Sequence, residues 1–86
     1  MYYVYVLQSE KDGHFYIGLT QDINRRVAEH NSGISMATKN RIPFRLVYYE
    51  FCLEYRDALK REKYLKSTWG KRYIKTRIGN YLNCLK

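Results

Sequence analysis

The sequence has little proline, glycine and cysteine, and it contains no long hydrophobic run. One proline and five glycines in 86 residues argue against a scaffold built mainly from loops. The two cysteines, Cys52 and Cys84, lack the spacing of a zinc-binding pair and cannot form a zinc site alone. No apolar segment approaches the roughly 20 residues that span a bilayer, and no signal-peptide pattern follows Met1. We therefore expect a cytoplasmic protein with reduced thiols and no membrane partner.

The length limits the fold to one small domain, which we expect to occupy residues 1–86. This size excludes a Rossmann fold, a TIM barrel and any pair of lobes with a cleft between them. Hydrophobic residues make up 45% of the chain and aromatic residues 16%, with ten tyrosines. This apolar content is enough for a real core, so the chain is not a disordered basic tail.

The positive charge is concentrated in the last third of the chain. Residues 1–55 carry six basic and six acidic side chains, whereas residues 56–86 carry ten and two, which accounts for the net charge of +8. Such a patch attracts polyanions by releasing their counterions, although a basic helix face can also serve only solubility. We expect the nucleic-acid contacts to come from Lys60, Arg61, Lys63, Lys66, Lys71, Arg72 and Lys75.

Three segments have the β-branched and aromatic composition of strands: residues 2–8, 14–20 and 44–51. The polar residues 9–13 form a turn between the first two, which predicts an antiparallel hairpin. Residues 32–42 show no clear period and are expected to be a polar connection.

The hairpin register decides how two tyrosines are placed. If Gln8 pairs with Gly13, Tyr5 lies directly opposite Tyr16. Residues paired across two strands share a face of the sheet, so the two phenols would be neighbours.

The remaining periodic segments predict helices. A helix over residues 21–31 begins with Thr20 as its cap, and the clearest helix covers residues 54–67. Gly70 interrupts the pattern before a last helical segment over residues 71–85. The predicted fold is α+β, a small three-stranded antiparallel sheet flanked by helices.

Glu62 falls on the apolar face of the helix predicted over residues 54–67, between Ala58 and Leu65. A carboxylate there is costly to desolvate unless it is paired. It could form a salt bridge with an arginine at the edge of the core, or it could reach solvent beside a narrower apolar face. Alternatively, Glu62 could bind a divalent cation such as Mg²⁺, which one carboxylate can hold together with water and phosphate oxygens.

Two further pairs of residues carry candidate chemistry. Arg26 and His30 share one helical stripe, where an arginine suits a phosphate and a histidine can move protons near neutral pH. Tyr5 and Tyr16 are the second pair. The simpler interpretations are two solvent-facing residues for the first pair and aromatic packing for the second.

Taken together, these segments resemble the GIY-YIG nuclease superfamily, and most closely its small stand-alone bacterial members, whose catalytic module is similar to that of the UvrC repair nuclease. The order of the motifs is more specific than any one of them. The matching segments are Tyr3-Val4-Tyr5, Tyr16-Ile17-Gly18, Asn24-Arg25-Arg26-Val27, Glu29-His30-Asn31-Ser32-Gly33 and Ala58-Leu59-Lys60-Arg61-Glu62-Lys63.

The resemblance implies a role for each site residue. Tyr5 matches the first-motif tyrosine, which helps to activate water, and Tyr16 matches the second, which orients water or phosphate. Arg26 matches the arginine that stabilises charge on the scissile phosphate, and His30 occupies a position that carries His or Tyr in relatives. Glu62 matches the glutamate that binds the single divalent metal.

The chain departs from the family pattern at two positions. Tyr3 replaces the glycine of the first motif, and Leu19 stands where some repair-type members carry a lysine. Without that lysine, Tyr5 and His30 remain the candidates for activating water. Gly18 matches the glycine that lets the backbone approach the site closely.

The implied function is a metal-dependent DNA endonuclease in repair or recombination, using Mg²⁺ or Mn²⁺ on branched or otherwise structured DNA. An alternative is a nucleic-acid-binding module that has kept the fold and lost useful turnover. RNA is a third possible substrate. No obligate protein partner is evident from the sequence.

Overall fold

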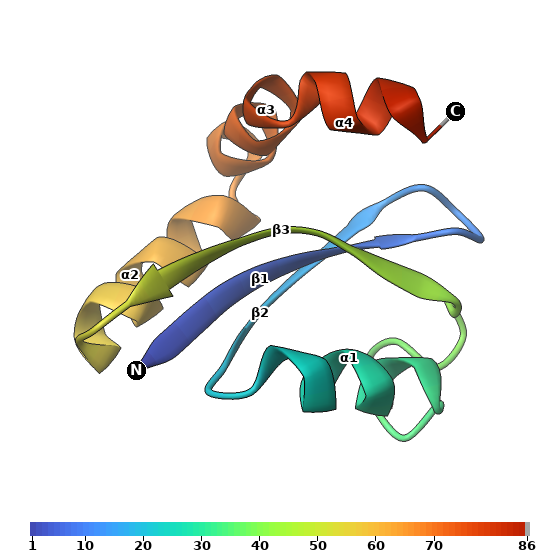
Figure 1. The fold of residues 1–86 in the computed structure, drawn as a ribbon, viewed down its shortest axis with the longest axis horizontal. Coiled ribbons are helices and arrows are strands. Elements are labelled where there is room, and N and C mark those ends of the chain that lie inside the picture. Colours follow the sequence, from blue (N-terminus) through green and yellow to red (C-terminus); the bar gives the residue numbers. More distant parts are fainter. Residues whose placement is uncertain (86) are drawn as a thin grey trace.

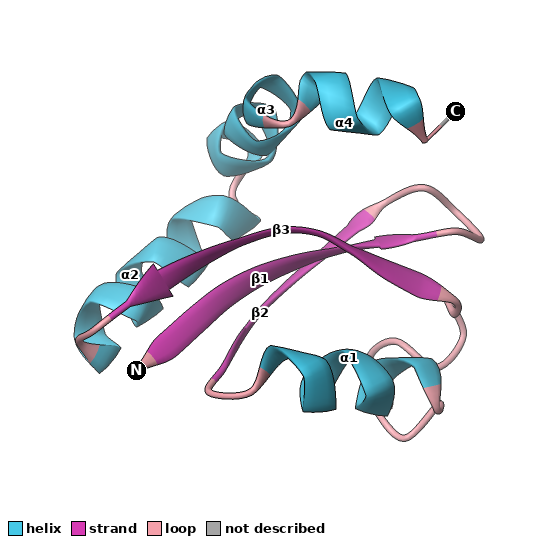
Figure 2. Cartoon of the chain, viewed as in Figure 1, coloured by secondary structure: helices cyan, strands magenta, loops and turns pink. Residues whose placement is uncertain are grey.

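The computed structural model describes residues 1–85. Its elements follow in the order β1 (Tyr2–Ser9), β2 (Phe15–Thr20), α1 (Ile23–Asn31), β3 (Phe44–Cys52), α2 (Tyr55–Lys66), α3 (Thr68–Arg77) and α4 (Gly79–Cys84). The strands form an antiparallel sheet in the order β2-β1-β3, with β1 in the centre. Helix α1 lies on one side of the sheet and helices α3 and α4 lie on the other (Figure 1). The predicted α+β fold with a three-stranded antiparallel sheet is confirmed (Figure 2).

The predicted register of the hairpin is wrong by two residues. Gln8 pairs with Phe15, so Tyr5 lies opposite Gly18 and Tyr16 lies opposite Leu7. The turn covers residues 10–14, one residue later than expected, because β1 continues to Ser9 and β2 begins at Phe15; Gly13 lies in this turn with a φ of 77°. A slip of two residues keeps every side chain on its face. Tyr5 and Tyr16 are therefore diagonal neighbours on one face, with ring centroids 6.5 Å apart.

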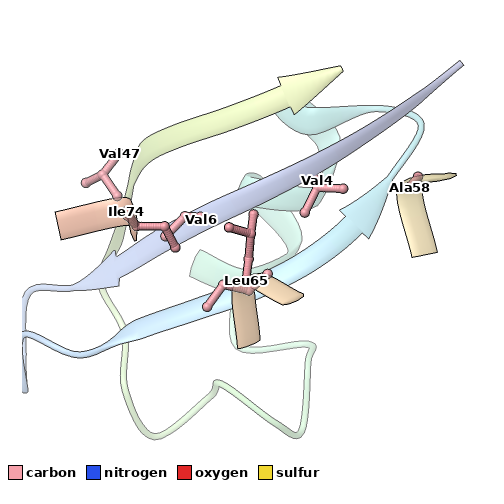
Figure 3. Packing of buried hydrophobic residues seen from close by; sticks show 7 residues of the cluster. Val4, Val6, Val47, Ala58, Leu65 and Ile74 are labelled. Carbon is pink, nitrogen blue, oxygen red and sulfur yellow. The ribbon is translucent and has the colours of Figure 1, made fainter. Parts of the chain in front are cut away.

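Each face of the sheet is covered by different helices. On one face, Val4 and Val6 of β1 pack against Ala58 and Leu65 of α2 and Ile74 of α3 (Figure 3). On the other face, Tyr5, Leu7 and Phe44 form a second buried cluster, against which Val27 of α1 packs. Because side chains alternate along β1, the central strand contributes to both clusters.

Helix α1 begins later than the sequence suggested. Its first residue is Ile23, and Asp22 rather than Thr20 caps it by accepting a hydrogen bond from the Arg25 amide at 3.1 Å. A carboxylate so close to the exposed amides of a helix start is a favourable cap. Thr20 instead accepts a hydrogen bond from the Asp22 amide at 3.1 Å.

The C-terminal helices also differ from the prediction. Gly70 does not interrupt a helix but lies in the first turn of α3, where its amide donates to the Ser67 hydroxyl at 3.1 Å. A side chain at Gly70 would collide with the α2 backbone at Tyr64, so glycine allows the two helices to pack closely. The single helix predicted over residues 71–85 is divided at Ile78, whose φ and ψ of −116° and 26° are not helical.

The connection between α1 and β3 is tied down at both ends. The Asn31 side chain donates to the Phe44 carbonyl at 3.0 Å and accepts from the Phe44 amide at 2.7 Å. Ser9 donates to the Arg41 carbonyl at 2.6 Å. These bonds fix the loop that carries Thr38 beneath the sheet. Across residues 1–85, no helix has both the length and the apolar character to cross a membrane.

Candidate active site

Tyr5 lies at the centre of the site because its phenol crosses the sheet over Gly18. The side chain is 1% exposed, and a Cβ atom at Gly18 would overlap the Tyr5 ring and its hydroxyl group. Only glycine at this position lets the phenol lie flat over β2. The glycine of the second motif therefore has a direct steric purpose in this chain.

The Tyr5 hydroxyl begins a buried chain of hydrogen bonds. Its oxygen lies 3.0 Å from His30 Nε2, and His30 Nδ1 lies 2.7 Å from the Thr38 hydroxyl oxygen. His30 and Thr38 are both fully buried. Both ring nitrogens of His30 are thus engaged, which fixes the plane of the imidazole against the phenol.

Aromatic rings form the wall of the site. Tyr16 meets His30 edge-on with centroids 4.9 Å apart, and Phe44 lies 6.2 Å from His30 and 6.5 Å from Tyr16. Such edge contacts are favourable and hold rings in place. The wall keeps water away from one side of His30.

Arg26 approaches the Tyr5 phenol from α1. Its guanidinium is close enough to act on the pKa of Tyr5, and its Nη1 is held by Glu29 at 3.0 Å. Glu29 also binds the neighbouring Arg25 at 3.3 Å, but the Arg25 side chain is 78% exposed. Glu29 therefore steers Arg26 toward the site while Arg25 points to solvent.

Glu62 of α2 is the remaining predicted site residue. Its side chain is 19% exposed, and its negative charge is among the influences that raise the pKa of Tyr5. Its carboxylate binds Lys66 at 3.2 Å, one turn further along the helix. The salt bridge considered from the sequence therefore exists, but its partner is an exposed lysine rather than an arginine of the core. A flexible lysine can leave this carboxylate when another cation arrives.

Burial shifts the pKa values of both partners in the central hydrogen bond. Burial raises the pKa of Tyr5, with smaller opposing influences from Arg26, so the phenol stays protonated at neutral pH. Burial also lowers the pKa of His30, and the positive charge of Arg26 lowers it further. Neutral imidazole beside a protonated phenol is a pair that can pass a proton between them.

The donor set near Tyr5 fits a hard divalent cation held by one carboxylate. No group of three or more His, Cys, Asp or Glu side chains suited to a metal occurs in the part of the chain that the structure describes. A closed zinc site is therefore not built from those residues. Mg²⁺ and Mn²⁺ can bind through one carboxylate with water and substrate phosphates, and Glu62 supplies that carboxylate beside Tyr5.

The predicted DNA contacts divide into two groups. Lys60, Lys63, Lys71, Arg72 and Lys75 are exposed on α2 and α3, and Lys66 is exposed but paired with Glu62. Arg61 differs, because it binds both carboxylate oxygens of Glu50 at 2.7 and 2.9 Å and stacks on Tyr73. A guanidinium held in this way is a structural link between α2 and β3, and we omit it from the proposed contacts.

Two residues of the site were not found from the sequence. Thr38 lies in a connection without periodicity, so nothing in the sequence indicates that it is buried beside His30. Glu29 did carry a signal, since it follows Arg25 and Arg26 at the spacing of helical ion pairs.

Comparisons with known proteins find relatives of this chain in one family. Residues 1–74 match the model of the GIY-YIG catalytic domain. UPF0213 protein CPE1444 of Clostridium perfringens is 42% identical over 67 residues, which cover 77% of this chain and 71% of the relative. A UPF0213 protein of Lacticaseibacillus paracasei is 44% identical over 66 residues, covering 76% and 73%.

A solved structure supports the same relationship over nearly the whole chain. The solution NMR structure of UPF0213 protein BH0048 from Bacillus halodurans superposes with a TM-score of 0.60 and 35% identity, covering 98% of this chain and 94% of that one. GIY-YIG domains are nuclease domains and generally use divalent metal ions. From its motifs, its fold and these relatives, the chain belongs to the GIY-YIG family.

Proposed function

We propose that this protein is a metal-dependent DNA endonuclease that hydrolyses phosphodiester bonds with Mg²⁺ or Mn²⁺ at Glu62. The proposal depends mainly on one observation: side chains from several elements contact the buried phenol of Tyr5 or shift its pKa. Tyr5 contacts His30, and its pKa responds to Tyr16, Arg26 and Glu62, which come from three further elements. A binding module has no need to collect these groups around a hydroxyl.

Water activation is assigned to the Tyr5–His30 pair. Because the pKa of Tyr5 is raised, the phenol acts as a relay rather than as a phenolate base. Its oxygen accepts a proton from the attacking water while its own proton passes to His30 Nε2, 3.0 Å away. His30 can accept there if its resting proton is on Nδ1, donated to Thr38. Tyr16 orients the water from the neighbouring position.

We assign to Arg26 the stabilisation of the negative charge that develops on the scissile phosphate. Its guanidinium is held beside Tyr5 by Glu29, so it is positioned before the substrate arrives. Fixed donors of this kind stabilise the charge that develops in the transition state. A divalent metal bound at Glu62 would supply a further positive charge for the phosphate and the leaving oxygen.

The alternative, a binding module without turnover, also has an observation in its favour. Lys66 neutralises Glu62 at 3.2 Å, so the carboxylate has a partner without any metal. The two functions predict different outcomes in one experiment. Purified protein and the Glu62→Gln variant are incubated with flapped, branched, nicked and linear DNA and with RNA, in Mg²⁺ or Mn²⁺. Cleavage by the wild type alone supports the nuclease, and binding without cleavage of any substrate supports the module.

We expect DNA binding to weaken steeply with salt. Five of the predicted contact residues, Lys60, Lys63, Lys71, Arg72 and Lys75, are exposed cations that can bind phosphate oxygens. We infer that the substrate is structured DNA, such as the branched intermediates of repair or recombination, rather than a specific sequence. Each neutralised phosphate adds about −0.9 to the slope of log K against log salt concentration. Fluorescence anisotropy from low to high salt measures this slope. Salt-independent binding would mean that this surface serves only solubility.

Gly18→Ala is expected to slow cleavage without weakening DNA binding. The new methyl group would overlap the Tyr5 ring and push the hydroxyl away from His30. A displacement of about 1 Å can cost on the order of 10²-fold in rate. Gly79→Ala is the control, because a methyl group there meets nothing within 4 Å. Equal single-turnover rates for the two variants would contradict the role assigned to Gly18.

Thr38→Val is expected to disturb His30 more than Thr38→Ser does. Valine keeps the shape but removes the hydroxyl at 2.7 Å, which leaves His30 Nδ1 unpaired in a buried position. An unsatisfied buried group costs about 1–3 kcal/mol in the free energy of unfolding, which urea denaturation measures. Nitrogen NMR of the imidazole should show a changed tautomer in Thr38→Val only. An unchanged tautomer would limit Thr38 to packing.

A further inference from the structure

A second candidate site lies on the face of the sheet opposite to Tyr5. The turn of the β1–β2 hairpin faces α4 across the sheet side that α3 and α4 cover (Figure 1). Residues of these elements line a groove of about 570 Å³. Gln8 pairs with both Phe15 and Arg45, so these three side chains share a face. Phe15 packs against the cluster that contains Ile74 of α3. The groove is therefore separate from the site around Tyr5, which lies on the α1 face.

The groove has an excess of positive charge. Lys71 and Lys75 occupy successive turns of α3, and Arg45 faces them from β3. Glu10 is the acidic residue of the lining, which also includes His14. Three permanent cations against one carboxylate favour an anionic ligand.

Arg45 has a donor that no described residue satisfies. Its Nε is buried and lacks a hydrogen-bond partner within residues 1–85, while its Nη2 makes a long contact of 3.5 Å with Glu10. Buried donors in proteins almost always find an acceptor. Because this Nε is shielded from the groove, a ligand there would meet the Nη groups of the partly exposed guanidinium, which suit phosphate oxygens.

Apolar side chains also line the groove. They are Phe15, Leu82 and Leu85, and the side-chain amides of Gln8 and Asn83 belong to the same lining. A lining of cations together with aromatic and aliphatic side chains suits a phosphate that carries an organic body. An inorganic anion alone would use only the cations.

We propose that this groove binds the phosphate of a nucleotide, either free or within a nucleic-acid strand. Arg45 binds the phosphate through its partly exposed Nη groups, Lys71 and Lys75 neutralise its charge, and the base or sugar packs against Phe15. This binding is independent of phosphodiester cleavage, because none of these residues contacts Tyr5, His30 or Glu62 in the described structure.

The test is an amide NMR titration of the full chain with pyrophosphate, with adenosine diphosphate and with a short single-stranded oligonucleotide. We expect saturable shifts at groove residues such as Gly13, His14 and Asn83. The double variant Lys71→Gln/Lys75→Gln should bind about tenfold more weakly or worse, because charge-assisted hydrogen bonds are lost. Both lysines are exposed on α3, so the fold should survive.

The control is Lys60→Gln/Lys63→Gln, which removes the same charge from α2 outside the groove. Retained pyrophosphate and adenosine diphosphate binding in the control, with loss in the groove variant, supports the proposal. Shifts from the oligonucleotide at the same amides identify a nucleic-acid strand as the source, and shifts from adenosine diphosphate alone identify a free nucleotide. Equal weakening in both variants, or no saturable shift at the groove, would overturn the proposal. Failure of the protein to cleave DNA would leave this result unaffected.

Discussion

Glu62→Gln is expected to abolish DNA cleavage while DNA binding persists. Glutamine keeps the shape of the side chain but removes the carboxylate whose negative charge helps to raise the pKa of Tyr5. Metal ions supply several kcal/mol of transition-state stabilisation, so the rate should fall by at least about 10²-fold. The substitution also releases Lys66 from its ion pair. DNA affinity should therefore stay the same or rise slightly.

Glu54→Gln is the matched control for this experiment. Glu54 caps the same helix, where its side chain accepts from the Arg56 amide, and an amide oxygen can do the same. Single-turnover cleavage in Mg²⁺ and Mn²⁺, with metal affinity measured by calorimetry, separates the two variants. If Glu62→Gln cleaves as fast as Glu54→Gln, the metal is not held at Glu62 and the site must be reassigned.

Two features of the sheet were predictable, because both depend on the two-residue period of side chains along a strand. They are the positions of the strands and the placement of two tyrosines on one face. The segment from Tyr2 to Leu7 is uniformly apolar or aromatic, and it became the central strand, buried on both faces. The exact register was not predictable, since it depends on the residues at which β1 ends and β2 begins on either side of the turn. Both registers keep Tyr5 and Tyr16 on the same face, so the error did not move the site.

The placement of the candidate site residues was predictable where they lie on regular elements. Glu62 lies between the buried Ala58 and Leu65, as the helical period indicated, and its side chain is mostly buried. The burial of Thr38 beside His30 could not be predicted, because a buried side chain in an irregular loop produces no periodic pattern in the sequence. Its position depends on distant hydrogen bonds, such as the one from Ser9 to the Arg41 carbonyl.

The first residue of α1 shows a similar limit. Thr20 and Asp22 are both good capping residues, and the choice between them depends on the geometry at the end of β2. The division between α3 and α4 at Ile78 is also set by tertiary packing, since the apolar period continues through residues 71–85.

Arg26→Ala is expected to lower the cleavage rate by about 10²–10³-fold, which is the typical cost of losing one fixed donor to the transition state. Arg25→Ala is a closely matched control. Both arginines bind Glu29, but Arg26 is 34% exposed and faces Tyr5, whereas Arg25 is 78% exposed. We expect Arg25→Ala to cleave at nearly the rate of the wild type, and similar losses in both variants would indicate a general charge effect.

The pH dependence of the cleavage rate is a second and independent test of the role of Arg26. Burial and the charge of Arg26 hold the pKa of His30 below its usual value. The wild type should therefore lose activity only as the pH falls below about 6.5, the usual pKa of histidine, because His30 must be neutral to accept the proton from Tyr5. Removing the guanidinium lets this pKa rise, so the acidic limb of the rate profile should move to higher pH in Arg26→Ala. The limb should stay in place in Arg25→Ala. A limb that does not move in Arg26→Ala would mean that His30 is not the group that accepts the proton.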